Sequence, residues 1–452
     1  MFGISLLAVI ILSGMVLRAK VELFRKFLLP ASLIAGFLGL ALSPQALNVI
    51  PARIVTEWSA LPGRLISVVF ACMFLGMELP SVSRIWRTSG PQVCYGFIAG
   101  IGQYFVGIAL TLLILTPVFG VPSIFATLIE IGFSGGPGTA SGMMEVFSSL
   151  GFPQGADLGL MSSTVGIFTG VVFGMIMINI AIRRSYTVVI KDAGNITQSL
   201  PATDRFTCGK PIGYTFTGFN SIDPLTFHLG FVGISILIGW LLYTGIRKTH
   251  PIMQSFPLFP MAMIGGILVQ LLATKLKIHR YIDRGCIERI QGAALDLLVA
   301  SAIASLNIQV IIAFAAPFAV LMCGGIIWML VLTWFLAPRM LPDAWFERSI
   351  VEFGMQTGVT AIGLMLLRVV DPEFKTGAAT SFGFKQMIYE PLLGGGLITS
   401  IAPFVILQFG AVKSLLITAV IMIVFAMMAG FSGFFHMHPE KHAPQSSLQH
   451  RG

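Results

Sequence analysis

Residues 130–144 read EIGFSGGPGTASGMM, and residues 352–365 read EFGMQTGVTAIGLM. Both segments begin with glutamate, carry glycine two and six residues later, and continue with Thr-Ala-x-Gly-x-Met. Between its two blocks, the second segment is one residue shorter than the first. Two blocks that recur in the same order at nearly the same offset predict a chain built by duplication.

An earlier stretch repeats as well, at a constant offset. The first copy consists of Leu28, Pro30, Ile34, Gly36 and Leu38, and the second of Leu258, Pro260, Ile264, Gly266 and Leu268. Glycine and proline are common in membrane helices, so one match alone would mean little. Together with the glutamate segments, it predicts two related halves.

The composition indicates a membrane protein, because 56% of the 452 residues are hydrophobic and only 10% are charged. A water-soluble globule of this size needs more polar surface. Apolar runs long enough to cross a bilayer recur along the chain. We predict eleven spans: Phe2 to Leu17, Phe27 to Leu47, Leu61 to Leu79, Val93 to Phe119, Ala156 to Ile182, Leu225 to Tyr243, Phe256 to Ala273, Ile290 to Ile308, Val310 to Leu336, Lys385 to Phe409 and Val412 to Phe435.

The two glutamate segments are predicted not to cross the membrane. The run from Ser134 to Thr139 holds three glycines and a proline and cannot continue a helix. Non-helical backbone at membrane depth must be buried in protein or line a wet cavity. We therefore interpret residues 124–150 and 350–367 as re-entrant hairpins, each of which enters and leaves by the same side.

The positive charges set the orientation. With the amino terminus outside, 23 of the 28 lysines and arginines fall on the inner side, as the positive-inside rule requires. The first hairpin then dips in from outside and the second from inside, the arrangement of inverted repeats. Membrane orientation also explains the net charge of +9 without any nucleic-acid partner.

The predicted fold is an all-α integral membrane protein with two inverted-topology repeats of five helices and one hairpin each, plus an extra helix. Between the halves lies a polar stretch without an apolar period, which we interpret as a cytoplasmic linker. The predicted parts are residues 1–182 (first repeat), 183–224 (linker), 225–409 (second repeat), 410–435 (extra helix) and 436–452 (cytoplasmic tail).

Several chemistries lack their sequence signatures. The five cysteines show neither paired nor metal-ligand spacing, so neither disulfides nor zinc are expected. The phosphate-loop, H-E-x-x-H and G-x-S-x-G patterns are missing from the sequence. ATP-driven transport and hydrolysis therefore have no support, and we expect a secondary transporter without a cofactor rather than an enzyme.

The hairpin tips are the candidate binding site. Amides at a helix start favour an anionic group, and carbonyls with hydroxyls suit a hard cation such as Na⁺. Two tips that meet near the midplane would form one site, reachable alternately from each face. A seam of small residues for helix packing is the alternative. The predicted substrate-binding residues are Ser134, Gly135, Gly136, Gly138, Thr139, Gln356, Thr357, Gly358 and Thr360.

Intramembrane acids are candidate sodium ligands or proton carriers, because a buried carboxylate needs a partner, a cation or a proton. Glu130 and Glu352 occupy matched positions, close to the mouths of their hairpins in this interpretation, where a solvated or capping role is the alternative. Asp296 lies inside an apolar span, and the alternative is a structural hydrogen bond. Thr164 completes the predicted sodium ligands, with back-bonding to its own helix as the alternative. Every lysine and arginine is expected in a loop or at a span end.

The sequence resembles the bacterial glutamate:sodium symporter family. Ser134, Gly135, Gly136, Gly138 and Thr139 match the Ser-Gly-Gly-x-Gly-Thr run of its first hairpin. The following helix matches as well, through Ala156, Gly159, Leu160, Thr164, Gly166 and Gly170. The resemblance covers most of the chain in topology, but in motifs it is dense only around the hairpins.

The resemblance implies a homodimer in the bacterial inner membrane, with a fixed scaffold and a moving transport domain, and sodium-coupled symport of glutamate. Pro137 departs from the histidine that these carriers usually have, and the second tip lacks their Gly-Ala-Thr-Pro-Thr form. The substrate is therefore left open as glutamate or a related carboxylate or amino acid, small and anionic or zwitterionic. A cation/proton antiporter and a channel are the alternatives.

Overall fold

The computed structural model describes residues 2–22, 24, 29–78, 80–190, 222–248, 254 and 256–435. Within this part every regular element is a helix, in agreement with an all-α membrane protein. The predicted cytoplasmic tail lies outside the described residues, as does most of the predicted linker.

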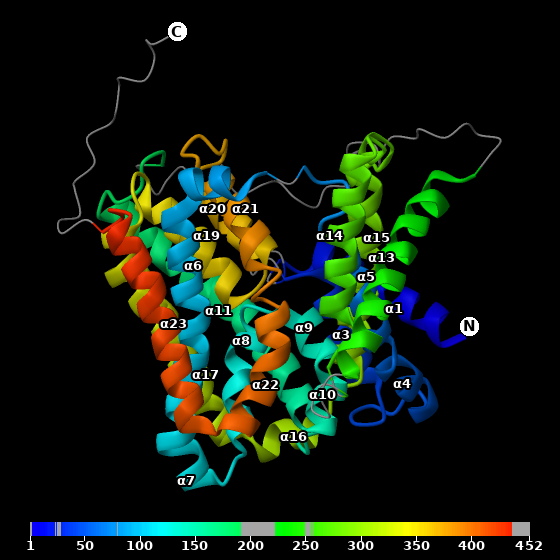
Figure 1. Cartoon of the computed structure of the whole chain (residues 1–452). Coiled ribbons are helices and arrows are strands. Elements are labelled where there is room, and N and C mark those ends of the chain that lie inside the picture. The colour runs from blue at the N-terminus through cyan, green and yellow to red at the C-terminus, as the bar shows by residue number, and fades with distance from the viewer. Residues whose placement is uncertain are drawn as a thin grey trace.

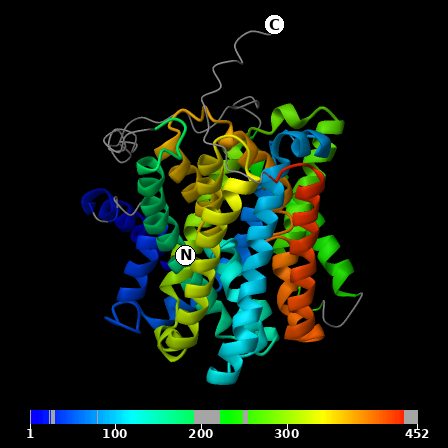
Figure 2. The same ribbon diagram turned by 90° about the vertical axis from the view of Figure 1, so that its left-hand side faces the viewer.

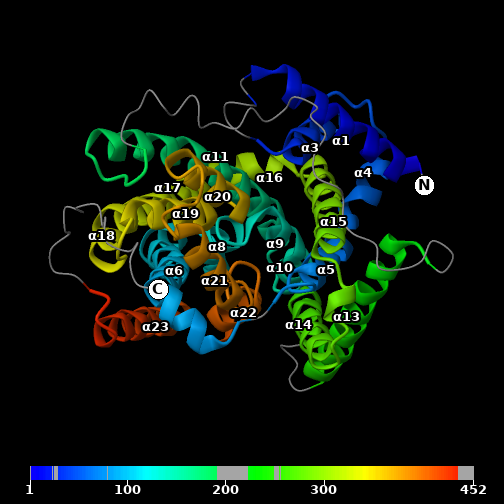
Figure 3. The same cartoon turned by 90° about the horizontal axis from the view of Figure 1, so that it is seen from above.

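The helices form two groups that lie side by side when the molecule is viewed from above (Figure 3). The first group contains α1 (Phe2–Lys20), α3 (Ala31–Leu42), α4 (Ala52–Ser59), α5 (Leu61–Cys72), α13 (Pro224–Arg247), α14 (Phe259–Lys275) and α15 (Arg284–Ala304). The second contains α6 (Val82–Leu110), α7 (Thr116–Phe119), α8 (Leu128–Gly132), α9 (Gly136–Gly142), α10 (Met144–Ser149), α11 (Gly155–Arg183), α16 (Ile308–Ala313), α17 (Ala315–Val331), α18 (Ala337–Met340), α19 (Trp345–Thr357), α20 (Thr360–Val370), α21 (Ala378–Tyr389), α22 (Leu397–Phe409) and α23 (Ala411–Phe431).

Seven of the eleven predicted spans coincide with helices long and apolar enough to cross a membrane: Phe2–Lys20, Ala52–Cys72, Val82–Phe119, Gly155–Arg183, Pro224–Arg247, Ala315–Met340 and Ala411–Phe431. The other four predicted spans contain shorter or more polar helices. One of these predictions, a continuous helix from Lys385 to Phe409, is wrong. The chain there breaks between α21 and α22, because Pro391 and three consecutive glycines at 394–396 interrupt the helix.

The two glycines matched in the sequence pack in matched ways in the first group. Gly36 of α3 lies against α15, where an added Cβ would come 2.6 Å from Ile303 Cβ. Gly266 of α14 lies against α5, where an added Cβ would come 2.5 Å from the Ala71 carbonyl oxygen. Both glycines permit close helix packing, of α3 on α15 and of α14 on α5.

A second correspondence appears in the long helices that precede the hairpins. A π-helical turn, Thr111–Leu115, follows α6 and leads into α7. An equal turn, Leu332–Leu336, follows α17 and leads into α18. The two turns begin 221 residues apart. Helices α6, α17 and α23 run alongside one another on one face of the second group (Figure 2).

Candidate functional site

The tips of the two glutamate segments meet inside the second group. The first segment folds as α8 and α9 and the second as α19 and α20, and Figure 1 shows the two pairs reaching toward each other from opposite ends. A Cβ atom placed on Gly136 would lie 3.0 Å from Val359 Cγ1 and 3.4 Å from the Gly358 carbonyl oxygen. The fold therefore brings together two turns that lie more than 200 residues apart in the chain.

Two helices begin where the tips meet. Helix α9 starts at Gly136, whose φ of +69° is a left-handed conformation that glycine adopts without strain. Helix α20 starts at Thr360. Neither helix receives a hydrogen bond from a side-chain cap. The first amides of a helix lack partners within it and carry partial positive charge, so these two helix starts are suited to an anionic group. Helices α8 and α19 end at the same tips, and their last carbonyls are suited to a cation.

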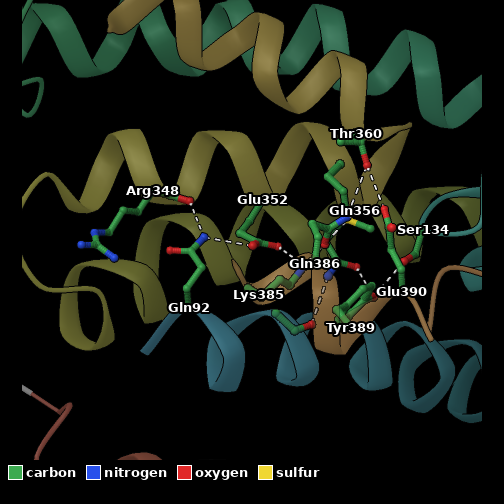
Figure 4. A network of polar contacts seen from close by, with 12 residues as sticks. Gln92, Ser134, Arg348, Glu352, Gln356, Thr360, Lys385, Gln386, Tyr389 and Glu390 are labelled. Atoms are coloured by element: carbon green, nitrogen blue, oxygen red, sulfur yellow. Dashed lines mark hydrogen bonds and ion pairs between the residues drawn. The ribbon is translucent and has the colours of Figure 1, made fainter. Parts of the chain in front are cut away.

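Tyr389, at the end of α21, links the two tips (Figure 4). Its hydroxyl lies 2.8 Å from Ser134 Oγ and donates to Gln356 Oε1 at 2.9 Å. The amide of Gln356 also donates to the Gly96 carbonyl of α6 at 3.0 Å. Both predicted tip residues are thus held by side chains that the sequence analysis did not single out.

The break after Tyr389 lies beside the first tip. Residues 390–396 are not helical, and Gly394 and Gly395 have positive φ angles. A Cβ atom on Gly395 would lie 2.4 Å from Thr139 Oγ1. That hydroxyl is buried and has no hydrogen-bond partner within the described residues. A buried orphan acceptor next to unwound backbone is a feature that a bound cation would explain.

Glu130 is fully buried on α8, so its predicted place near a solvated hairpin mouth is wrong. The Gly394 amide and the Thr399 hydroxyl donate to its Oε1 at 2.9 and 2.8 Å. The Tyr104 hydroxyl donates to its Oε2 at 2.5 Å. All three donors are neutral, and within the described residues no lysine, arginine or histidine nitrogen lies within 4.0 Å of this carboxylate.

Glu352 is also fully buried, but a cation neutralises it. Lys385 Nζ lies 2.9 Å from Glu352 Oε2, and both side chains have no exposed surface. Gln92 donates to the other carboxylate oxygen at 2.9 Å. The prediction that every lysine lies in a loop or at a span end is therefore wrong at Lys385. Removing one partner of such a pair costs about 3–5 kcal/mol, because the other charge is left buried and alone.

A second polar chain runs from Lys385 to the tip of the second hairpin. Lys385 Nζ donates to Gln386 Oε1 at 2.8 Å. The Gln386 amide donates to Glu390 Oε1 at 2.9 Å and to the Thr360 hydroxyl at 3.3 Å. Thr360 and Glu390 are only half-buried, so the polar chain ends in groups that are less enclosed than Lys385.

The other predicted residues are distributed as follows. Thr357 and Thr164 donate back to their own helices, to the carbonyls of Phe353 and Leu160, which is the alternative given for Thr164. Asp296 lies on α15 in the first group with an exposed side chain. Gly135, Gly138 and Gly358 lie at the tips as predicted. The location of these residues does not test whether they bind substrate or sodium, so both roles stay predictions.

The residues that the sequence analysis missed all lie on or beside the broken helix. Lys385, Gln386, Tyr389 and Thr399 are the principal ones. On α6, Gln92, Gln103 and Tyr104 donate to Glu352, to the Gln356 carbonyl and to Glu130. One local signal for this region is present in the sequence, namely the helix-breaking run at residues 390–396, which holds Pro391 and three glycines. It interrupts a helix by the same rule that identified the first hairpin.

The model of a family described as sodium/glutamate symporter matches residues 2–371. The search of curated proteins returned no match.

Proposed function

Because this chain belongs to the sodium/glutamate symporter family, and is therefore a multi-pass membrane transporter, we propose that it takes up glutamate or a related carboxylate or amino acid with Na⁺ by alternating access. The substrate site is the meeting point of the two hairpin tips and the broken helix. The observation that carries the proposal is the contact of Gly136 with Gly358 and Val359. Two separate turns and one helix break converge there, and unwound backbone inside a membrane protein is kept where it binds something.

The site favours an anionic group. Helices α9 and α20 direct their uncapped amino-terminal ends to the meeting point, and each such end carries about half a positive charge. The ammonium group of Lys385, which lies beneath Tyr389, is already paired with Glu352. Carboxylate recognition thus falls to backbone amides and to hydroxyls such as those of Ser134 and Thr360.

Sodium belongs beside the first tip in this proposal. The Glu130 carboxylate has three neutral donors and no cationic partner within the described residues, and the Thr139 hydroxyl nearby is buried without a partner. A carboxylate, a hydroxyl and unwound carbonyls are the oxygen ligands that a hard cation takes. Bound Na⁺ would neutralise Glu130 and attract the substrate's carboxylate to the neighbouring tip.

In this proposal the chain consists of two inverted halves. The matched packing of Gly36 and Gly266 supports this, as do the two π-helical turns that begin 221 residues apart. The amino terminus lies outside and the carboxyl terminus in the cytoplasm. The first group of helices is the scaffold and the second the transport domain. A homodimer in the bacterial inner membrane completes the proposal.

The conformation supports access from the inner side. Helix α9 packs against α5 and α15 of the scaffold, and Gly138 contacts Ile66 there. On the other side of the meeting point, Ala361 at the start of α20 is exposed. In this proposal the scaffold closes access past the first tip, and access past the second tip is from the inner side. Alternating access requires the transport domain to move so that the reverse holds.

Uptake into proteoliposomes tests this function. With Na⁺ outside and K⁺ inside, we expect concentrative, saturable uptake of labelled glutamate or of a related acid that competes with it. Replacing external Na⁺ by choline should abolish the uptake. An antiporter would instead change the lumenal pH without organic substrate, and a channel would conduct without saturation; either result would refute symport.

A further inference from the structure

The surroundings of Lys385 Nζ are those of a small cation site. Its ligands are Glu352 Oε2 at 2.9 Å and Gln386 Oε1 at 2.8 Å. The ring of Tyr389 lies beneath it, with the centroid 3.7 Å from Nζ. A carboxylate oxygen, an amide oxygen and an aromatic face are groups that attract a monovalent cation. Within this chamber, Lys385, Glu352 and Tyr389 are fully buried, and Gln386 is 7% exposed.

The wall of the chamber is shaped around the lysine. A Cβ atom on Gly96 of α6 would lie 2.2 Å from Lys385 Cε and 3.1 Å from Nζ. Any larger residue would therefore exclude the lysine stem. The side chain enters from α21, and its charged end is placed between α6 and α19.

We propose that the Lys385 ammonium is a tethered cation, which fills a monovalent-cation site formed by Glu352, Gln386 and Tyr389 and so takes the place of one mobile coupling ion. The consequence for coupling rests on the proposed function, whereas the cation site itself does not. In a chain with a short side chain at position 385, the same chamber would take Na⁺ from solution.

The comparison with Glu130 supports this inference. The two acids occupy matched positions in the sequence repeat and both are fully buried. Glu352 is paired with an ammonium group, while the hydrogen bonds that Glu130 accepts within the described part of the chain come from the neutral donors Tyr104, Gly394 and Thr399. Glu352 is thus balanced by a charge that is covalently part of the chain, on α21, and Glu130 depends on a mobile ion or proton.

The tethered charge is connected to both tips. Tyr389, which covers the ammonium with its ring, contacts Ser134 and Gln356 through its hydroxyl. Gln386, which accepts from the ammonium, donates to Thr360. A cation in this chamber therefore orders the substrate site, whether it is an ammonium group or a sodium ion.

Thermal unfolding of the purified full-length protein tests the site without any transport. Wild type, K385A and K385M/E352Q are compared in NaCl and in choline chloride at equal ionic strength. The double variant keeps the volume of both side chains but removes both charges. We expect Na⁺ to raise the Tm of K385A by at least about 2 °C more than that of wild type, and the rise in K385M/E352Q to equal the wild-type rise.

An equal Na⁺ response of K385A and wild type would overturn the proposal, as would an enhanced response that persists in K385M/E352Q. Recovery of folded K385A only when it is purified in Na⁺ would support the proposal. Failure of K385A to fold even in Na⁺, while K385M/E352Q folds, would show that the chamber does not accept the ion and would overturn it. Absence of uptake by wild type would refute the proposed function but leave the Na⁺ response of K385A unaffected.

Discussion

Replacing Gly136 by valine is expected to abolish uptake while leaving membrane insertion intact. Gly136 has a φ of +69°, and a β-branched residue held there costs on the order of 1–3 kcal/mol. Its Cβ would also lie 3.0 Å from Val359, so the added methyl groups would push the tips apart. The variant should reach the membrane in normal amount but show no Na⁺-driven uptake of labelled substrate in proteoliposomes.

Gly151 provides the matched control. It has a similar φ of +78°, but a Cβ atom there would meet nothing within 4 Å. Gly151→Val thus carries the same backbone strain outside the tips and should retain most of its uptake. Normal uptake by Gly136→Val, or equal losses in both variants, would show that the first tip does not form the site.

The second large effect is expected for Glu130→Gln. Glutamine keeps the shape of the side chain, and its carbonyl oxygen can still accept from the Gly394 amide and the Thr399 hydroxyl. The negative charge that Na⁺ would neutralise is lost. We expect Na⁺-driven uptake to disappear and the Tm to become insensitive to Na⁺ in this variant. The Tm in choline should not fall, because no buried charge remains to be balanced.

Glu347→Gln separates the loss of a buried charge from the loss of a sodium ligand. Glu347 is a fully buried acid on α19 that accepts from the Val188 amide at 2.6 Å, away from the tips. We expect this variant to retain Na⁺-dependent uptake. Uptake by Glu130→Gln at the wild-type rate, with unchanged dependence on Na⁺, would contradict the role given to Glu130.

The turn between α8 and α9 is predictable from the sequence, because the glycines and the proline of Ser134 to Thr139 cannot continue a helix. The run from Ser134 to Thr139 predicts a turn, and the second copy of the surrounding pattern, at residues 352–365, predicts the segment that corresponds to it. The contact between the tips was not readable in the same way. It depends on how α6 and α11 pack against both segments, and no local pattern encodes that packing.

Lys385 shows where sequence reasoning failed. A lone lysine at the start of an apolar run was interpreted as a charge at the membrane surface, since burial of an unpaired ammonium is unfavourable. Its partner, Glu352, lies 33 positions away in the sequence on another helix. Only the fold brings the two together, so the pattern of charges alone predicted the common case and missed the pair.

The most direct test of two hairpins that enter from opposite sides is side-specific labelling. Single cysteines would replace Ser123 and Ser149 beside the first hairpin, and Arg339 and Glu373 beside the second, in a chain whose five native cysteines are replaced. A membrane-impermeant maleimide is added to intact cells and to inside-out vesicles. We expect the first two to react only from outside and the last two only from inside. Reaction of all four from one side, or of the two ends of one hairpin from different sides, would contradict the opposed hairpins on which the transport site depends.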